Sequence, residues 1–101
     1  GAVTAIFCAT DEIAEEVYQA AVMLGRRIPK DLSVVGYGNV DFGSRLNPPL
    51  TTVRQRPYRM GQAAARMMIE RIEAESREKP RIERLPVEFV ARQSTAAPAA
   101  R

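Results

Sequence analysis

The 101-residue chain lacks several residues on which common protein chemistry depends. It contains no histidine, which excludes histidine-based catalytic triads, histidine general bases and histidine metal clusters. A single cysteine, Cys8, stands in an apolar stretch, so no internal disulfide can form and a small buried side chain is expected there. No CxxC, GxxxxGK[ST] or GxGxxG motif is present, because the Gly36-Tyr37-Gly38 run lacks the third glycine. We therefore expect no cofactor, no metal and no enzymatic activity.

Long apolar runs and concentrated charge are also missing. No run approaches the ~20 apolar residues of a membrane span, and no secretory leader pattern opens the chain. We therefore expect a cytoplasmic protein without a membrane partner. The net charge is only +3 and the basic residues are spread along the chain, too sparsely for a nucleic-acid-binding stripe. A hydrophobic content of 46% and this length predict one globular domain or part of one.

The clearest structural pattern lies between Leu32 and Gln55. The apolar run over 32–37 predicts a strand buried on both faces, which ends at a glycine-rich corner around Gly38. A short helical turn is expected over 42–46, followed by two prolines that enforce extended backbone. Residues 50–53 then resume as a second strand. In open α/β sheets, ligands bind at the carboxyl ends of the strands.

Two further segments extend this α/β pattern toward the N-terminus. Residues 3–9 predict another buried strand, and because it starts almost at the first residue, we expect the natural chain to continue upstream. Thr10 and Asp11 are good helix N-caps, and apolar residues then recur every three or four positions over 11–24. The expected buried stripe consists of Ile13, Val17, Ala20, Ala21 and Leu24. Such short connections predict parallel strands.

The second half of the chain begins with another helical pattern. Residues 58–74 carry a methionine-rich apolar stripe at helical spacing. The charged run over 73–79 is expected to be a solvated helix end and loop. Residues 81–90 alternate between apolar and polar around a proline, which predicts an edge strand, and the small residues of 94–101 are expected to fray.

Three uncharged polar residues, Thr10, Asn39 and Gln55, follow the three predicted strands. Taken singly, each is a common cap or turn residue. Together they lie where a parallel sheet presents its ligand edge, and their hydroxyl and amide groups both donate and accept hydrogen bonds. This pattern suits a polyhydroxylated or zwitterionic small molecule.

A family resemblance is carried by four runs: TAIFCATDEIA, LGRRIPKDLSVVGYGNVDFGSRLNPPLTTVRQ, MGQAAARMMIERI and LPVEFVARQST. Together they closely resemble the C-terminal third of LacI/GalR-type bacterial transcriptional regulators. This implies an α/β fold: an incomplete periplasmic-binding-protein-like (type I) domain with a parallel sheet flanked by helices. Residues 1–55 and 86–95 would belong to the C-terminal subdomain, and 57–84 to the helix and crossover of the N-terminal subdomain. The helix over 58–74 would then expose its methionine-rich face, so we expect a homodimer or higher oligomer.

The resemblance also implies ligand contacts. Thr10 stands where the family commonly has an asparagine, and Gln55 matches a family glutamine at the crossover. Asp11 matches the acid at the helix start and is interpreted as a cap. Gly38, which precedes Asn39, replaces an aspartate that in most members grips sugar hydroxyls or a base edge. Because the missing carboxylate no longer repels an anion, we expect a sugar or sugar-acid effector.

In the family, the turn after the strand over 32–37 forms part of the dimer interface. The residues at those places are Glu15, Phe42, Arg45 and Leu46. An alternative is that Phe42 and Leu46 fill the local core. The predicted function is the effector-binding and dimerisation region of a LacI-type regulator that binds DNA through a separate N-terminal domain. The alternative function is a periplasmic sugar-binding component of a transporter.

Overall fold

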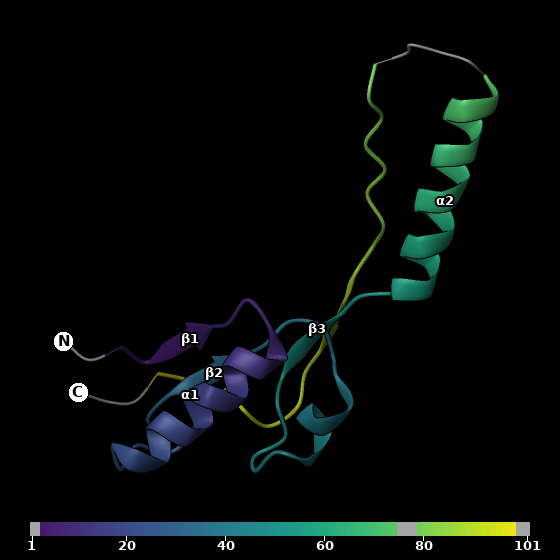
Figure 1. Ribbon diagram of the computed structural model, residues 1–101. Helices are drawn as coiled ribbons and strands as arrows, with labels where there is room; N and C mark the ends of the chain where they lie inside the picture. Colours follow the sequence, from purple (N-terminus) through teal and green to yellow (C-terminus); the bar gives the residue numbers. More distant parts are fainter. Residues whose placement is uncertain (1–2, 75–78, 99–101) are drawn as a thin grey trace. The chain divides into compact units, whose positions relative to one another are not determined.

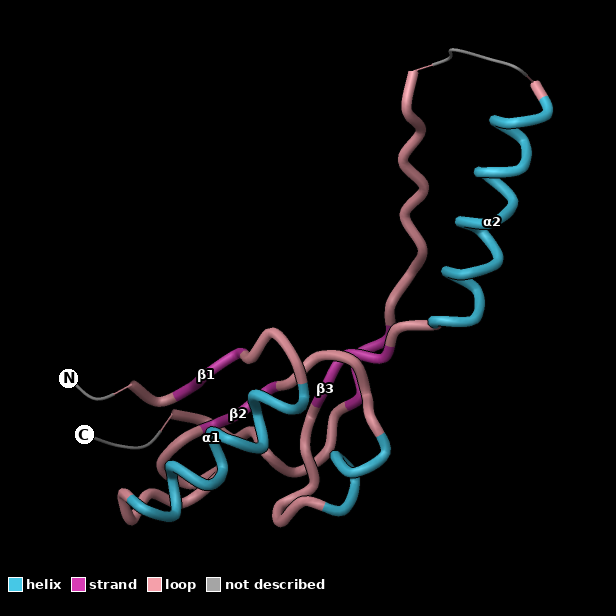
Figure 2. Tube along the Cα trace, in the orientation of Figure 1, coloured by secondary structure: helices cyan, strands magenta, loops and turns pink. Residues whose placement is uncertain are grey.

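The computed structural model describes residues 3–74 and 79–98. The elements follow in the order β1 Ala5–Phe7, α1 Asp11–Met23, β2 Ser33–Val35, the 3-10 helix η1 Asp41–Arg45, β3 Thr52–Arg54, α2 Pro57–Glu73 and β4 Glu88–Val90 (Figures 1 and 2). The chain forms two compact units. The sheet unit comprises Gly1–Arg54 and Glu88–Arg101, and the helix unit comprises Gln55–Val87. The assignment of these units to two subdomains of a larger domain stays a prediction.

The strands of the sheet unit pair mainly in parallel. β1 pairs with β2 in the register Ile6↔Val34, which confirms the expected parallel pairing around α1. The segment 51–53 continues the sheet beyond β2, because the N–H groups of Gly36 and Gly38 donate to the carbonyls of Thr51 and Val53 at 2.9 and 2.8 Å. β4 pairs antiparallel with β3 at this edge. The carboxyl ends of β1, β2 and β3 are thereby brought to one edge of the sheet.

Helix α1 packs on β2 (Figure 1). The packed face matches the prediction only in part, with Ala21 buried and Val17 against the core as expected. Its buried residues are Asp11, Ala14, Tyr18 and Ala21. Ile13 and Leu24, expected in the buried stripe, are 44% and 74% exposed. Tyr18 explains the rotation, since its ring enters the core while its hydroxyl donates to the Pro48 carbonyl at 2.7 Å. The small side chains of Ala14 and Ala21 permit close contact on either side of it.

Strand β1 is shorter and less buried than predicted for residues 3–9. Val3 and Phe7 are 58% and 69% exposed, whereas Cys8 is buried as expected and Ile6 packs on the core. Side chains alternate between the two faces of a strand, so only the face shared by Ile6 and Cys8 meets α1. The prediction of a strand buried on both faces was therefore wrong for β1. The core itself consists of Cys8, Ala14, Tyr18, Leu32, Val34 and Leu50.

The segment after β4 is tied to the sheet instead of fraying. Ser94 is fully buried, and its carbonyl accepts from the Val34 N–H at 2.9 Å. The Ser94 hydroxyl donates to the Val34 carbonyl at 2.5 Å and accepts from the Thr51 N–H at 2.8 Å. Further on, the Ser33 hydroxyl bonds both backbone groups of Ala96. Residues 99–101 of the predicted tail lie outside the described residues.

The helix unit contains α2 and an extended segment that runs back beside it (Figure 2). α2 confirms the helix expected over 58–74, but Ala63 is its only buried residue. Regular strand structure within the predicted edge strand is limited to β4, and residues 75–78 of the predicted charged loop lie outside the described residues. Ion pairs connect the two arms of the unit, from Arg66 to Glu83 at 3.1 Å and from Arg81 to Glu70 at 2.8 Å. No helix within the described residues is long and apolar enough to cross a membrane.

Candidate ligand-binding corner

The glycine corner after β2 adopts the backbone conformation that its residues allow. Gly38 has a φ of +124° and Asn39 a φ of +59°. The first value is accessible almost only to glycine, and asparagine is one of the few other residues that tolerate the second. An aspartate at position 38, the residue usual in the resembling family, would be strained here. The backbone angles at position 38 therefore favour glycine, and a glycine there brings no carboxylate to the corner.

The start of α1 lies directly against this corner. The Asp11 N–H donates to the Tyr37 carbonyl at 3.1 Å, which places Thr10 beside the corner at the carboxyl end of β1. Thr10 is the N-cap, because its side-chain oxygen accepts from the Ile13 N–H at 3.1 Å. The sheet unit thus brings together Thr10, Gly38 and Asn39. Gln55 follows β3 in the chain but is the first residue of the helix unit.

Asp11 is a buried hydrogen-bonding centre, so its interpretation as a helix cap was wrong. Its side chain is completely buried. One carboxylate oxygen accepts from the Val40 N–H at 2.9 Å and the other from the Thr52 hydroxyl at 2.7 Å. A buried carboxylate needs such donors to replace water. Asp11 therefore joins three segments: the helix start, the corner and β3. Thr52 had not been singled out, since nothing local distinguishes it from other strand threonines.

Gly36 makes this arrangement possible. A Cβ atom at this position would overlap the Asp11 carboxylate and approach the Leu50 side chain to 2.9 Å. Any side chain at position 36, directly after β2, would displace the Asp11 carboxylate and disrupt its hydrogen bonds to Val40 and Thr52. The glycine is required for close approach and not for its backbone angles.

Arg92 also holds the corner, and its role was likewise not predicted from the sequence. Its guanidinium donates to the Asn39 side-chain oxygen at 2.8 Å and to the Leu50 carbonyl at 2.9 Å. Its backbone N–H donates to the Thr51 hydroxyl at 3.0 Å. The one available signal was its position in the family-like run LPVEFVARQST, which gives no role by itself.

Two titratable side chains in the core of the sheet unit, Cys8 and Tyr18, have raised pKa values. Burial, with a smaller contribution from the Asp11 carboxylate, raises the pKa of the Cys8 thiol. Burial also raises the pKa of Tyr18, against a smaller lowering by its interaction with Ser94. Both groups are therefore neutral at neutral pH, and the buried thiol is not an activated nucleophile. Within the described residues no group of three histidine, cysteine or acidic side chains could hold a metal ion.

Comparison with known proteins identifies the family. Residues 2–95 match the family described as periplasmic binding protein-like domain. The chain belongs to this family. The ribose operon repressor of Halalkalibacterium halodurans is 39% identical over 90 residues, which cover 89% of this chain and 27% of that protein. The HTH-type transcriptional repressor PurR of Photobacterium profundum is 38% identical over 91 residues, covering 90% and 27%.

Solved structures of the family share this fold. A LacI family transcriptional regulator from Enterococcus faecium with bound ribose matches with a TM-score of 0.78 and 38% identity, covering 95% of this chain and 35% of that one. A lac repressor dimer bound to operator and an anti-inducer matches with a TM-score of 0.80 and 32% identity, covering 93% and 32%. The resemblance to LacI-type regulators and the fold class are thus confirmed. The chain spans about a quarter of the length of the curated relatives (27% for both).

The predicted dimer residues of this family member lie on α1 and around η1. Glu15 and Phe42 are partly buried and Arg45 is exposed. Leu46 packs against the core cluster, which favours the alternative core role for that residue. Their contribution to an interface stays a prediction.

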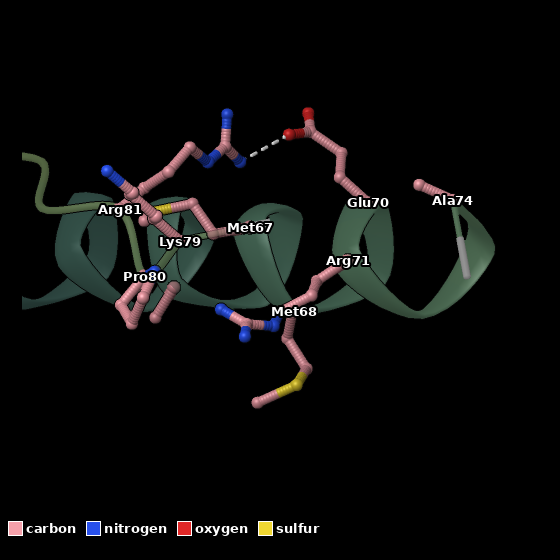
Figure 3. Close-up of a pocket in the computed structure, with 9 residues that line it drawn as sticks. Met67, Met68, Glu70, Arg71, Ala74, Lys79, Pro80 and Arg81 are labelled. Atoms are coloured by element: carbon pink, nitrogen blue, oxygen red, sulfur yellow. Dashed lines mark hydrogen bonds and ion pairs between the residues drawn. The ribbon is translucent and has the colours of Figure 1, made fainter. Parts of the chain in front are cut away.

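The helix unit contains a separate hollow between α2 and the segment that begins at Lys79 (Figure 3). Its apolar lining residues include Met67, Met68 and Pro80, and the ion pair between Glu70 and Arg81 lies beside it. Of its charged lining residues, Glu70 and Arg81 pair with each other at 2.8 Å. The hollow lies along the methionine-bearing side of α2.

Proposed function

We propose that this segment forms part of the effector-binding and dimerisation region of a LacI-type transcriptional regulator that senses a sugar or sugar acid. The main support is the convergence of Thr10 with the Gly38–Asn39 corner at the carboxyl ends of parallel strands, in a chain whose relatives are transcriptional repressors. The effector contacts are Thr10, Gly38, Asn39 and Gln55. Because the curated relatives are repressors, a transport component is not proposed.

The effector acts by differential binding. A regulator of this kind exists in two states, and a small molecule shifts the equilibrium only by binding one of them more tightly.

DNA contact belongs to a separate N-terminal domain, and the protein works in the cytoplasm as a homodimer or higher oligomer without catalytic activity. Glu15, Phe42 and Arg45 contribute to the dimer contact, and Leu46 supports them from the core.

The corner favours an effector with an acidic group. A Gly38 backbone in place of an aspartate side chain presents no negative charge to a bound carboxylate. Ribose, which is bound in the Enterococcus faecium regulator, is the neutral comparison. Calorimetric titration of the natural protein that carries this segment compares its affinities for D-gluconate and D-ribose. Tight binding of ribose without a response to gluconate would contradict the preference for an acid.

Substitution of Gln55 by leucine tests the site. The change keeps side-chain size while removing the amide, so effector affinity should fall about tenfold, the usual cost of one lost hydrogen bond. Gln19→Leu is the matched control, because Gln19 is exposed on α1 and is no predicted contact. Equal affinity in both variants would remove Gln55 from the site. Absence of any sugar or sugar-acid binding, with no effect of either on operator affinity, would reject the proposed function.

A further inference from the structure

Arg92 occupies an unusual place in the connectivity of the chain. It lies two residues beyond β4, the strand by which the chain returns to the sheet unit after the helix unit. From there its side chain reaches the corner, at Asn39, and the Leu50 carbonyl that precedes β3. One guanidinium therefore connects the returning strand with the predicted ligand corner.

The corner has two consecutive residues with positive φ, a conformation that must be held by its surroundings. Besides the local bond from the Gly43 N–H to the Val40 carbonyl, three hydrogen bonds to other segments of the described chain do this. Gly38 donates to Val53 at 2.8 Å, Val40 donates to Asp11 at 2.9 Å, and Asn39 accepts from Arg92 at 2.8 Å. Of these three bonds, only the one from Arg92 joins a charged donor to a side chain of the corner. It is also the only one of the three that comes from a residue beyond β4.

The electrostatic setting of this arginine differs from that of the arginines in the exposed ion pairs. Arg54, Arg66 and Arg81 each pair with a glutamate. Arg92 is partly buried, and its hydrogen-bond partners among the described residues are neutral oxygens. A planar guanidinium holds its donors in a rigid fork and contacts two such oxygens at fixed angles, whereas a lysine ammonium carries its donors on a flexible stem. Its geometry therefore orients Asn39 and does not serve a surface ion pair.

We propose that Arg92 is a positioning residue: it fixes the Gly38–Val40 corner through Asn39 and couples that corner to the strand returning from the helix unit. The role in effector response depends on the proposed function. The role in fixing the corner does not, so the two can fail separately.

Amide exchange measured by NMR on the unliganded chain tests the positioning role. In Arg92→Gln, exchange of the Gly38 and Val40 amides should accelerate about tenfold or more, as expected for loss of a charged hydrogen bond, while the Val34 amide keeps its rate. Arg27→Gln, which removes an arginine from an exposed ion pair with Asp31, is the control and should change none of these rates. Unchanged corner amides in Arg92→Gln, or equal acceleration of Val34, would overturn the proposal.

Asn39→Asp provides a second variant in case Arg92→Gln does not fold. Aspartate tolerates the positive φ and would form a charge-assisted pair with Arg92, so the corner amides should exchange several-fold more slowly. Unchanged or faster exchange of the corner amides in Asn39→Asp would show that Arg92 does not act through residue 39.

The natural regulator tests the coupling role. Arg92→Lys should reduce the ratio of operator affinities without and with D-gluconate or D-ribose about tenfold, while the operator affinity of the unliganded protein stays within twofold. An unchanged ratio would overturn the coupling. A wild-type protein that responds to neither compound would reject the proposed function, and the exchange measurement would still decide whether Arg92 positions the corner.

Discussion

The sheet unit and the helix unit stabilise their structures by different means. In the sheet unit, Asp11, Thr51, Thr52 and Ser94 are completely buried, and each makes hydrogen bonds to other segments. In the described part of the helix unit only Ala63 is buried, and the contacts between its two arms are exposed ion pairs. Exposed pairs contribute at most about 1 kcal/mol each, whereas an unsatisfied buried polar group costs about 1–3 kcal/mol.

This difference determines how each unit responds to change. The sheet unit has a core and a buried polar network that specify one arrangement of its segments. α2 relies on local helix preference, and an isolated helix of its 17 residues is only marginally stable in water. Its exposed apolar side chains are Tyr58, Met60, Met68, Ile69 and Ile72. The helix unit should therefore gain more from an apolar partner surface than the sheet unit does.

The sharpest test applies one substitution to both units. Gly36→Ala should lower the free energy of unfolding by about 3 kcal/mol or more, because the new methyl group displaces the Asp11 carboxylate. Gly61→Ala in α2 meets no atom within 4 Å and should raise helix stability by about 0.5–1 kcal/mol. Urea unfolding monitored by circular dichroism measures both. A loss of stability in both variants, or in neither, would contradict the distinction between the units.

Removal of one buried hydroxyl should have the next largest effect. Ser94→Ala leaves the Thr51 N–H and the Val34 carbonyl without that partner, which should cost about 2–3 kcal/mol. Ser44→Ala removes an exposed hydroxyl that bonds only the Asp41 carbonyl, and should cost less than about 0.5 kcal/mol. Thermal unfolding of the two variants gives the difference. Equal melting temperatures would show that the buried Ser94 hydroxyl contributes no stability.

Self-association should respond to the exposed face of α2. Ile72 is 66% exposed, and Ile72→Glu should weaken any association through this face at least tenfold while leaving the folded sheet unit intact. Val22→Glu changes a comparably exposed valine on α1 (80%) and serves as the control. Light scattering over a concentration series reports the effect. A tight monomer at high concentration in the unsubstituted chain would reject association through α2.

The smallest expected effect is a loss of stability at alkaline pH confined to the sheet unit. The folded-state pKa of Cys8 lies above its ordinary value of 9.0, so the folded state holds the thiol proton more tightly than the unfolded state. Stability is therefore complete below about pH 9 and falls as the pH rises through the folded-state pKa. Cys8→Ala should flatten the dependence of the urea midpoint on pH between 8.5 and 10, the part due to Tyr18 remaining. An identical pH profile would exclude Cys8 as a cause.

Elements with a strong local signal were predictable from the chain. The helix at α2, the strand at β2 and the turn at η1 follow from helical spacing, a β-branched run and proline punctuation. The side of α1 that is buried was not predictable, because Ala14 and Tyr18 carry less apolar weight in a stripe than Ile13 and Leu24. The small residues of α1 and its hydrogen-bonded tyrosine decided which side is buried. The effect of both depends on the residues that they contact in the rest of the sheet unit.

The residues of the candidate site likewise divide into those that could be predicted from the sequence and those that could not. Thr10, Gly38 and Asn39 could be proposed from their positions after strands, since the ends of parallel strands meet at one edge of the sheet. Arg92, Ser94 and Thr52 could not, because their partners lie 41 to 60 positions away in the chain. The sequence alone determined where the strands and helices lie along the chain, and where the glycine corner stands, through local backbone preference. Only the tertiary structure decided which polar side chains are buried together, because a buried group must find its partner wherever the fold places one.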